Sequence, residues 1–290
     1  MARIVGLLLV LIVAVGCANQ TLTPTSALPT PPITPPTAPT PGETLAIEHP
    51  TGATDIVLRM AISGGLRYPG ATVEPPPAFT LYGDGRVIYS IQRPRPDGST
   101  LTELRQARLT EEQIATMVEN ALGPGGLAAA RVWYADVPIA DDVTTNFEVH
   151  AGGVDKTVAV YALGYSEEGM PDAAARLAFE GLAQALRGFG AEVAAGNAED
   201  LGPFEPQAYR VTLDDPFGPM EANREWPWQD LEPADFQLDN SGFRTRILTA
   251  EQATAIADPP MSAPDGVVVR APDGAEYLVR LLALLPDQLP

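Results

Sequence analysis

The chain contains a single cysteine, Cys17, and this limits how the rest of the sequence can be stabilised. One thiol cannot form a disulfide within the chain, whereas small secreted domains commonly depend on several such bonds. The residues after Cys17 must therefore be held together by packing. The sequence can supply that packing, because 45% of its residues are hydrophobic and the stretch 45–290 is long enough for one large or two modest domains.

Cys17 ends an N-terminal segment with the features of a secretory signal. Arg3 gives the segment a positive start, and 4–15 is an unbroken run of apolar or small residues. Such a run is typical of a signal peptide and is shorter than the roughly 20 apolar residues that span a bilayer. Ala14-Val15-Gly16-Cys17 resembles the lipobox of bacterial lipoproteins, with Ala14 where these proteins usually carry a larger aliphatic residue.

The resemblance implies that residues 1–16 are removed and that Cys17 becomes a lipidated N-terminus. A diacylglyceryl group on the sulfur, often with a third chain on the amine, would anchor the protein in the cell membrane, facing outside the cytoplasm. One acyl chain binds membranes only marginally, so several chains suit a stable anchor. An ordinary signal peptide with an incidental cysteine is the alternative.

The segment that follows, 17–44, is predicted to be a disordered linker. Within it, residues 21–42 are almost wholly Thr and Pro, and proline excludes helix and central strand. At about 3.1 Å per residue an extended stalk of this length reaches roughly 70 Å. Pro-rich segments can also dock into aromatic grooves, and Thr/Pro stalks can be O-glycosylated.

The charge of the chain excludes two classes of partner. The net charge is −19 and the pI is near 4.3, so the cations that neutralise nucleic-acid phosphates are lacking. Attraction to anionic lipid headgroups is excluded for the same reason, so any membrane association must come from the N-terminal lipid.

The first half of the folded part reads as strands, hairpins and helices. Residues 55–62 alternate apolar and other residues, which predicts a strand. A hairpin is expected over 79–91 around Gly83-Asp84-Gly85, and a second around 151–153. A capping box at 110–113 begins a helix whose apolar face repeats with helical spacing, formed by Ile114, Met117, Val118, Ala121 and Leu122.

A further helix over 171–188 is expected to bury one apolar face, formed by Leu177, Gly181, Leu182, Ala185, Leu186 and Phe189.

The second half repeats this order in shorter form. A strand at 209–213 precedes a hairpin at 236–248, a capping box at 249–252 and a last hairpin at 267–285. The predicted fold class is α+β, with two small antiparallel hairpin-plus-helix subdomains at 45–198 and 199–290. An internal duplication would explain the shared order, and so would coincidence, because hairpins and capping boxes are common.

The folded part also resembles a group of uncharacterised lipoproteins of actinobacterial type. The matching stretches are 81–87, the hairpin from 142–145 to 161–164, and the closing Leu284-Leu285-Pro286-Asp287. These are structural turns and strands, so the resemblance implies no catalytic residue.

No compact catalytic constellation is found in the sequence. The only histidines are His49, beside the stalk, and His150, which shares strand parity with Glu148; a surface role is expected for both. Two distant histidines without a free thiol do not indicate a zinc site. The stretch 164–169 has one residue too many for a nucleophile elbow, and 152–157 departs from a phosphate loop at Asp155. No catalytic residue, metal or cofactor is therefore predicted.

Two features are candidates for ligand binding. Asp136, Asp141 and Asp142 fall in one loop after Trp133 and Tyr134. The carboxylates can be plain loop solvation and turn caps, a Ca²⁺ or ligand site, or the acid pair of a glycosidase.

The second feature is Trp226-Pro227-Trp228, which contains two of the three tryptophans. An exposed pair can stack on sugars or anchor a partner, whereas a buried pair wedges parts of the core together; burial is the favoured interpretation.

The sequence therefore predicts a lipid-anchored extracytoplasmic protein that binds a protein or glycan partner at the cell envelope without catalysis. The alternative is a secreted hydrolase that uses carboxylates around 136–142 on envelope glycans or peptides. A transporter's solute receptor is a third reading, but such receptors have doubly wound α/β lobes, and hairpins are predicted here in place of βαβ crossovers.

Overall fold

The computed structural model describes residues 47–65, 74–95, 100–165, 170–215, 224–239, 242–256 and 263–290. The predicted signal segment, Cys17 and the linker 17–44 lie outside these residues, so the expectations about them stay predictions. Thr44–Pro290 forms one compact unit. None of the helices in the described ranges is long and apolar enough to cross a bilayer.

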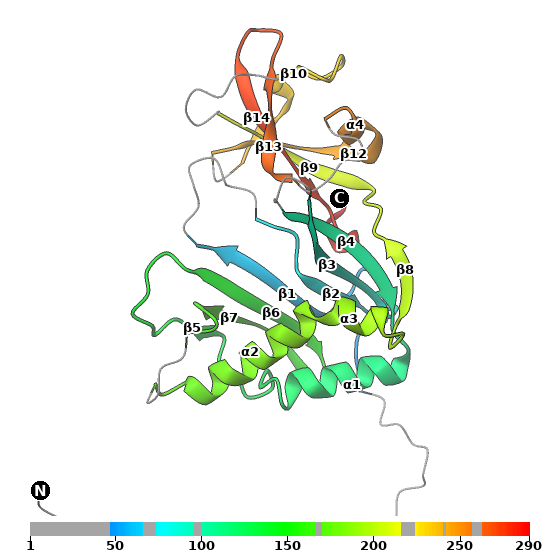
Figure 1. Ribbon diagram of the computed structural model, residues 1–290, viewed down its shortest axis with the longest axis vertical. Coiled ribbons are helices and arrows are strands. Elements are labelled where there is room, and N and C mark those ends of the chain that lie inside the picture. The colour runs from blue at the N-terminus through cyan, green and yellow to red at the C-terminus, as the bar shows by residue number, and fades with distance from the viewer. Residues whose placement is uncertain are drawn as a thin grey trace, which may run out of the picture. The chain divides into compact units, whose positions relative to one another are not determined.

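Two sheets organise the described residues (Figure 1). The larger, sheet A, has eight strands in the order β5-β7-β6-β1-β2-β3-β4-β8. Their bounds are β1 (Ile56–Gly64), β2 (Phe79–Tyr82), β3 (Arg86–Pro94), β4 (Thr100–Arg108), β5 (Trp133–Tyr134), β6 (Val143–Ala151), β7 (Val154–Tyr161) and β8 (Glu199–Pro203). All neighbours are antiparallel except the short β5, which runs parallel to β7.

The smaller sheet, sheet B, has six strands in the order β10-β13-β14-β9-β12-β11 within the described ranges. Their bounds are β9 (Ala208–Asp214), β10 (Arg224–Glu225), β11 (Gln237–Leu238), β12 (Arg244–Thr249), β13 (Ala263–Arg270) and β14 (Glu276–Ala283). The helix α4 (Ala250–Thr254) and the single turns η1 (Pro233–Asp235) and η2 (Pro286–Gln288) complete this part of the chain.

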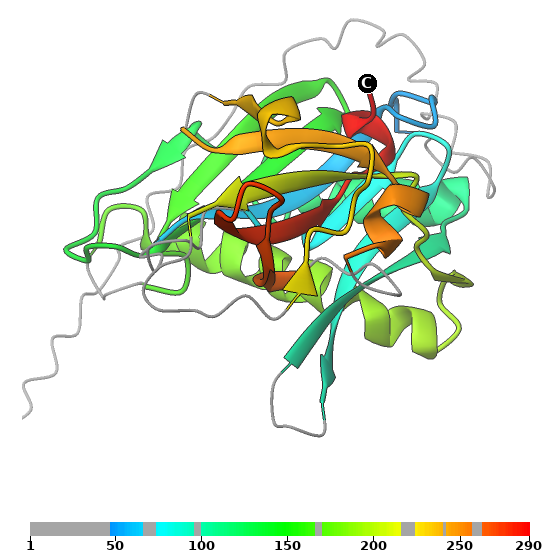
Figure 2. The same cartoon turned by 90° about the horizontal axis from the view of Figure 1, so that it is seen from above.

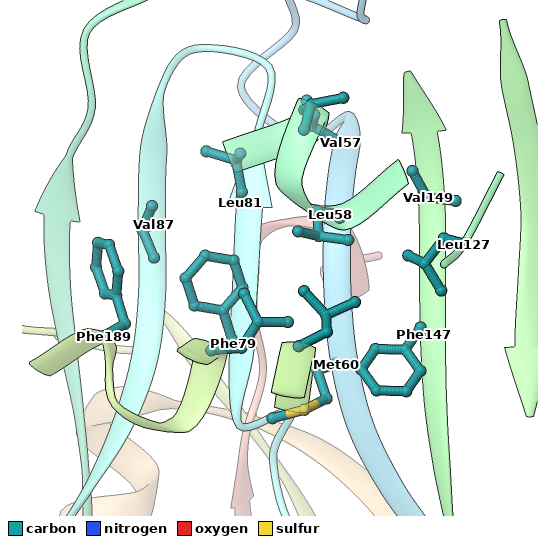
Figure 3. Close-up of a cluster of buried hydrophobic side chains, with 14 of the residues drawn as sticks. Val57, Leu58, Met60, Phe79, Leu81, Val87, Leu127, Phe147, Val149 and Phe189 are labelled. Carbon is teal, nitrogen blue, oxygen red and sulfur yellow. The ribbon is translucent and has the colours of Figure 1, made fainter. Parts of the chain in front are cut away.

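Three helices cover one face of sheet A: α1 (Glu111–Leu122), α2 (Ala173–Arg187) and α3 (Phe189–Ala194) (Figures 1 and 2). Alternate residues of the central strands point towards them, and Met60, Phe79 and Phe147 lie side by side across β1, β2 and β6 (Figure 3). These side chains are fully buried. Because strand side chains alternate between faces, the core fixes which residues must point to the opposite side of the sheet.

A second core joins sheet B to the opposite face of sheet A. Sheet A contributes Tyr82, Ile88 and Leu104, and sheet B contributes mainly alternate residues of its central strands. Trp228 and Phe236 complete this cluster.

Most predicted elements are confirmed, and so is the α+β class. The capping box at Thr110 begins α1, and the one at Thr249 begins α4. The hairpin β2–β3 turns at Gly85, whose φ of +82° and close approach to the Leu109 carbonyl leave no room for a Cβ. The turn residues Asn240 and Ser241 of the predicted hairpin 236–248 lie outside the described residues.

One helix face was predicted wrongly in part. Leu182, Leu186 and Phe189 are buried as expected, but Leu177 is 59% exposed, and Gly181 and Ala185 are exposed as well. Arg176 is buried in place of its apolar neighbour. Its guanidinium donates to the carbonyls of Tyr161 and Ala162 at the end of β7 and pairs with Asp172.

The predicted internal duplication is not confirmed. In each sheet the first strand lies centrally with a hairpin on either side. In sheet A, β1 pairs with the first strand of each hairpin, whereas in sheet B, β9 pairs with the second strand of each. The strand orders therefore differ. In addition, the segment Glu199–Pro203, which the sequence assigns to the smaller domain, forms β8 and pairs with β4 of sheet A.

Candidate functional site

The polar faces of the two sheets enclose a cleft of about 570 Å³. Sheet A lines it with Arg59, Ala61 and Ser63 of β1 and with Asn146 and Glu148 of β6. These positions follow from the core, because Met60 and Phe147 point to the helices and their sequence neighbours must point away.

Sheet B supplies the opposite wall of the cleft. Arg210 and Thr212 of β9, Thr245 of β12 and Leu282 of β14 line it. The strand register explains this grouping, because Thr212 is opposite Thr245 and Arg210 is opposite Leu282. The alternate residues of β9, such as Val211, are buried in the second core.

Arg59 is held in a fixed position on the sheet A wall. Its guanidinium donates to Asp287 Oδ1 at 2.6 Å, and its Nε donates to the hydroxyl of Thr80 at 3.2 Å. The Tyr82 hydroxyl donates to the same Asp287 oxygen at 2.6 Å, and Glu148 lies 3.6 Å from the guanidinium. Asp287 belongs to η2, so this group ties the end of the chain to two strands of sheet A.

The environment of this group favours charged arginine and neutral tyrosine. Burial by itself lowers the pKa of Arg59, but the hydrogen bond and negative charge of Asp287 outweigh it and raise that pKa above its usual value. Burial, together with the same carboxylate, raises the pKa of Tyr82 well above its usual range. Arg59 therefore stays charged and Tyr82 stays neutral across the physiological range.

The polar contacts continue along β6 towards the β6–β7 turn. Glu148 accepts from His150 at 3.1 Å, and the other ring nitrogen of His150 lies 2.8 Å from Asp155. The predicted parity of His150 with Glu148 is confirmed. His49 differs from expectation, because its side chain is only 6% exposed and contacts Glu111 and the Pro50 carbonyl.

Arg210 contrasts with Arg59. It is exposed to solvent on the sheet B wall, and its side chain makes no hydrogen bond or ion pair with any described residue. Its five N–H donors are therefore available to a molecule in the cleft.

The three predicted carboxylates do not form a compact acidic centre. Asp136 pairs with Arg131 and its side chain is 82% exposed. Asp142 accepts from the amide of Val143, and Asp141 has a φ of 59°, a turn conformation that Asp tolerates. Within the described ranges, no three His, Cys, Asp or Glu residues are grouped as a metal site requires.

The predicted tryptophan pair belongs to the second core. Trp228 is 7% exposed and donates its indole N–H to the Gln252 carbonyl. Trp226 is partly buried, packs edge-on against Trp228 at 5.0 Å and donates to the Leu231 carbonyl. Both indole N–H groups are hydrogen-bonded within the protein, so the pair is part of the second core and is not a binding surface.

The cleft residues were not singled out from the sequence. The sequence of β1 contains a signal that identifies one of them, because Arg59 is the one charged residue of this strand and lies between Leu58 and Met60. A charge at the centre of a buried strand needs a partner, but nothing local indicates Asp287 as that partner.

The cleft is lined by hydrogen-bond donors and acceptors, including two arginines, and to a similar extent by apolar side chains such as Ile62, Phe243 and Leu282. This chemistry suits recognition of a polar molecule. Comparison with protein-family models, curated proteins and solved structures finds no match, so the functional argument rests on this geometry and on the sequence.

Proposed function

We propose that the protein is a lipid-anchored, extracytoplasmic binding protein whose cleft holds a polar ligand of the cell envelope. The observation that carries the proposal is that a fixed arginine, Arg59, and an accessible one, Arg210, line opposite walls of the same cleft. A preformed wall lowers the ordering cost of binding, and a free side chain opposite can close on the ligand.

The sequence supports the anchored location. The lipobox-like segment ends at Cys17, and 17–44 would serve as the spacer that carries the folded unit away from the membrane. We expect Cys17→Ser to release the protein from membranes or leave its signal uncut. Membrane fractionation at mature size despite the substitution would contradict the anchor.

The binding role is tested by thermal unfolding of the mature full-length protein with fractionated envelope extract. A ligand at about 100 times its Kd stabilises the native state by about 2.7 kcal/mol, which raises the Tm by several degrees. We expect at least one fraction to do this for the wild type and for Arg244→Glu, but not for Arg210→Glu.

Arg244 is the matched control because it is exposed, makes no side-chain bond to a described residue and lies outside the cleft lining. Equal shifts for all three proteins, or none for the wild type, would refute a ligand in the cleft. Turnover of the stabilising compound would instead favour the hydrolase alternative.

A further inference from the structure

One tryptophan is exposed where the other two are packed. Trp133 is 52% exposed on β5, at the edge of sheet A. Its neighbour Tyr134 is buried and packs against Phe179 of α2, so the two side chains point to opposite faces of the sheet. Trp133 therefore lies on the face of sheet A that also forms the cleft wall.

The strand register connects Trp133 to the cleft. Trp133 is opposite Ala159 of β7, Ala159 is opposite Asn146 of β6, and Asn146 is opposite Ala61 of β1. Neighbouring strands are about 4.8 Å apart, so this row covers roughly 14 Å. Asn146 and Ala61 line the cleft, and the row therefore leads from the exposed indole into it.

Polar side chains border this row on both sides. On one side, Glu148 is flanked by Thr157 and Arg59. On the other side, Thr144 is flanked by Tyr161 and Ser63, and the two alanines of the row project less than these neighbours.

The predicted acidic loop forms one rim of the same face. The Tyr161 hydroxyl donates to the Ile139 carbonyl and accepts from the Asp142 amide. These two bonds hold the loop that carries Asp141 and Asp142 beside the row. The loop is therefore fixed to Tyr161, which borders the row through its pairing with Thr144.

We propose that this face binds a neutral glycan chain, with Trp133 stacking on one sugar ring and the cleft holding the next units. The inference rests on the proposed binding function and names its ligand class. Sugar rings present an apolar C–H face to an aromatic ring and hydroxyls to planar polar groups such as the Asn146 amide, whose nitrogen also donates to the Ser63 hydroxyl at 2.8 Å.

The charges of this face of sheet A support a neutral ligand, and the rest of the described cleft lining sets two acidic residues, Glu74 and Asp239, beside the one cation Arg210. Arg59 is neutralised by Asp287 and Glu148, and Thr144, Asn146, Thr157 and Tyr161 are uncharged. The net charge of −19 opposes binding of a polyanion. A protein partner would be expected to meet a larger apolar anchor than one indole.

The experiment measures binding of three hexasaccharides by calorimetry and tryptophan fluorescence: β-1,4-linked glucose, β-1,4-linked N-acetylglucosamine and α-1,6-linked mannose. The mature full-length protein is used. We expect at least one to bind and change the indole emission. Trp133→Ala should weaken that binding at least tenfold, Trp133→Phe less, and Asn146→Ala at least fivefold.

Leu177→Ala is the matched control, because it removes a similarly exposed apolar side chain on α2, on the helical side of sheet A. The affinity of Leu177→Ala for the hexasaccharide should equal that of the wild type. Unchanged Tm values show that the variants are folded. Absence of binding for all three sugars at millimolar concentration, or equal affinity of Trp133→Ala, would overturn the glycan assignment.

The two proposals fail separately. If envelope extract stabilises the wild type but not Arg210→Glu, while no hexasaccharide binds, the cleft function stands and the glycan assignment is wrong. If neither assay gives a signal, both proposals are wrong.

Discussion

The two walls of the cleft use the same type of residue in opposite ways. On the sheet A wall, Arg59 is fixed by Asp287, Thr80 and Glu148. On the sheet B wall, Arg210 projects without a described partner. The core of sheet A packs against three helices, whereas the core of sheet B packs against short segments and the side chains of Trp226 and Trp228. The comparison indicates a rigid wall that defines the cleft and an adaptable wall that responds to its contents.

The largest difference in stability between the two walls is expected from Asp287→Ala. This change leaves the Arg59 charge and the Tyr82 hydroxyl in a mostly buried site without their shared acceptor. Removing one partner of such a pair costs about 3 kcal/mol of unfolding free energy. Urea unfolding measures it.

Arg210→Ala is the control on the other wall, and it should change stability by less than about 0.5 kcal/mol because no described contact is lost. If the two variants were equally stable, Arg59 would not be held in the way described, and the contrast between the walls would disappear.

A second, smaller effect is a loss of stability at high pH, caused by one buried tyrosine in each sheet. Burial raises the pKa of Tyr209 in β9 to about 12, and it raises that of Tyr82 in β2 further. Because the folded-state pKa values are higher than those of the unfolded chain, their stabilisation is fully present below pH 10 and is lost above it. Tyr209 alone should account for about 1 kcal/mol of loss between pH 9 and pH 11.

Urea unfolding at the two pH values measures this loss. Tyr209→Phe removes its share of the pH dependence and leaves that of Tyr82, whereas Tyr82→Phe does the converse. A wild-type stability that stays constant up to pH 11 would contradict the burial of both hydroxyls.

Local patterns in the sequence predict which residues of β1 and β6 face away from the core. They do not predict that the two sheets come together to form a cleft. The alternation of β1 places Arg59 opposite the core, and the parity of β6 does the same for Glu148. Hairpins and capping boxes were predictable because turn residues and caps act within four residues. The strand β4 was missed, since Glu103 and Arg105 on either side of Leu104 are charged and only half buried.

The site itself depends on contacts that no local pattern encodes. Arg59 and Asp287 are 228 positions apart, and their pairing exists only once η2 returns to sheet A. The burial of Arg176 instead of Leu177 has a similar cause, because the guanidinium satisfies strand carbonyls that hydrophobic periodicity ignores. Packing between distant elements decided both cases.

The smallest difference in stability is expected from the N-terminal caps of α1 and α4, which are chemically identical. In α1, Gln113 N–H donates to Thr110 Oγ1 at 3.3 Å, and Gln252 N–H donates to Thr249 Oγ1 at 3.3 Å in α4. Replacing Thr by Ala at a cap typically costs about 1 kcal/mol. We expect that cost for Thr110→Ala in urea unfolding and about half for Thr249→Ala.

The two costs differ because the two helices bury different amounts of apolar surface. The twelve residues of α1 bury Ile114 and Val118 against sheet A, and Gln113 also donates to the Asn197 carbonyl beyond α3. The five residues of α4 bury one alanine, so fraying of its first turn exposes little apolar surface. An equal or larger cost for Thr249→Ala would show that sheet B depends on α4 as much as sheet A depends on α1, and the adaptable wall would then be as rigid as its counterpart.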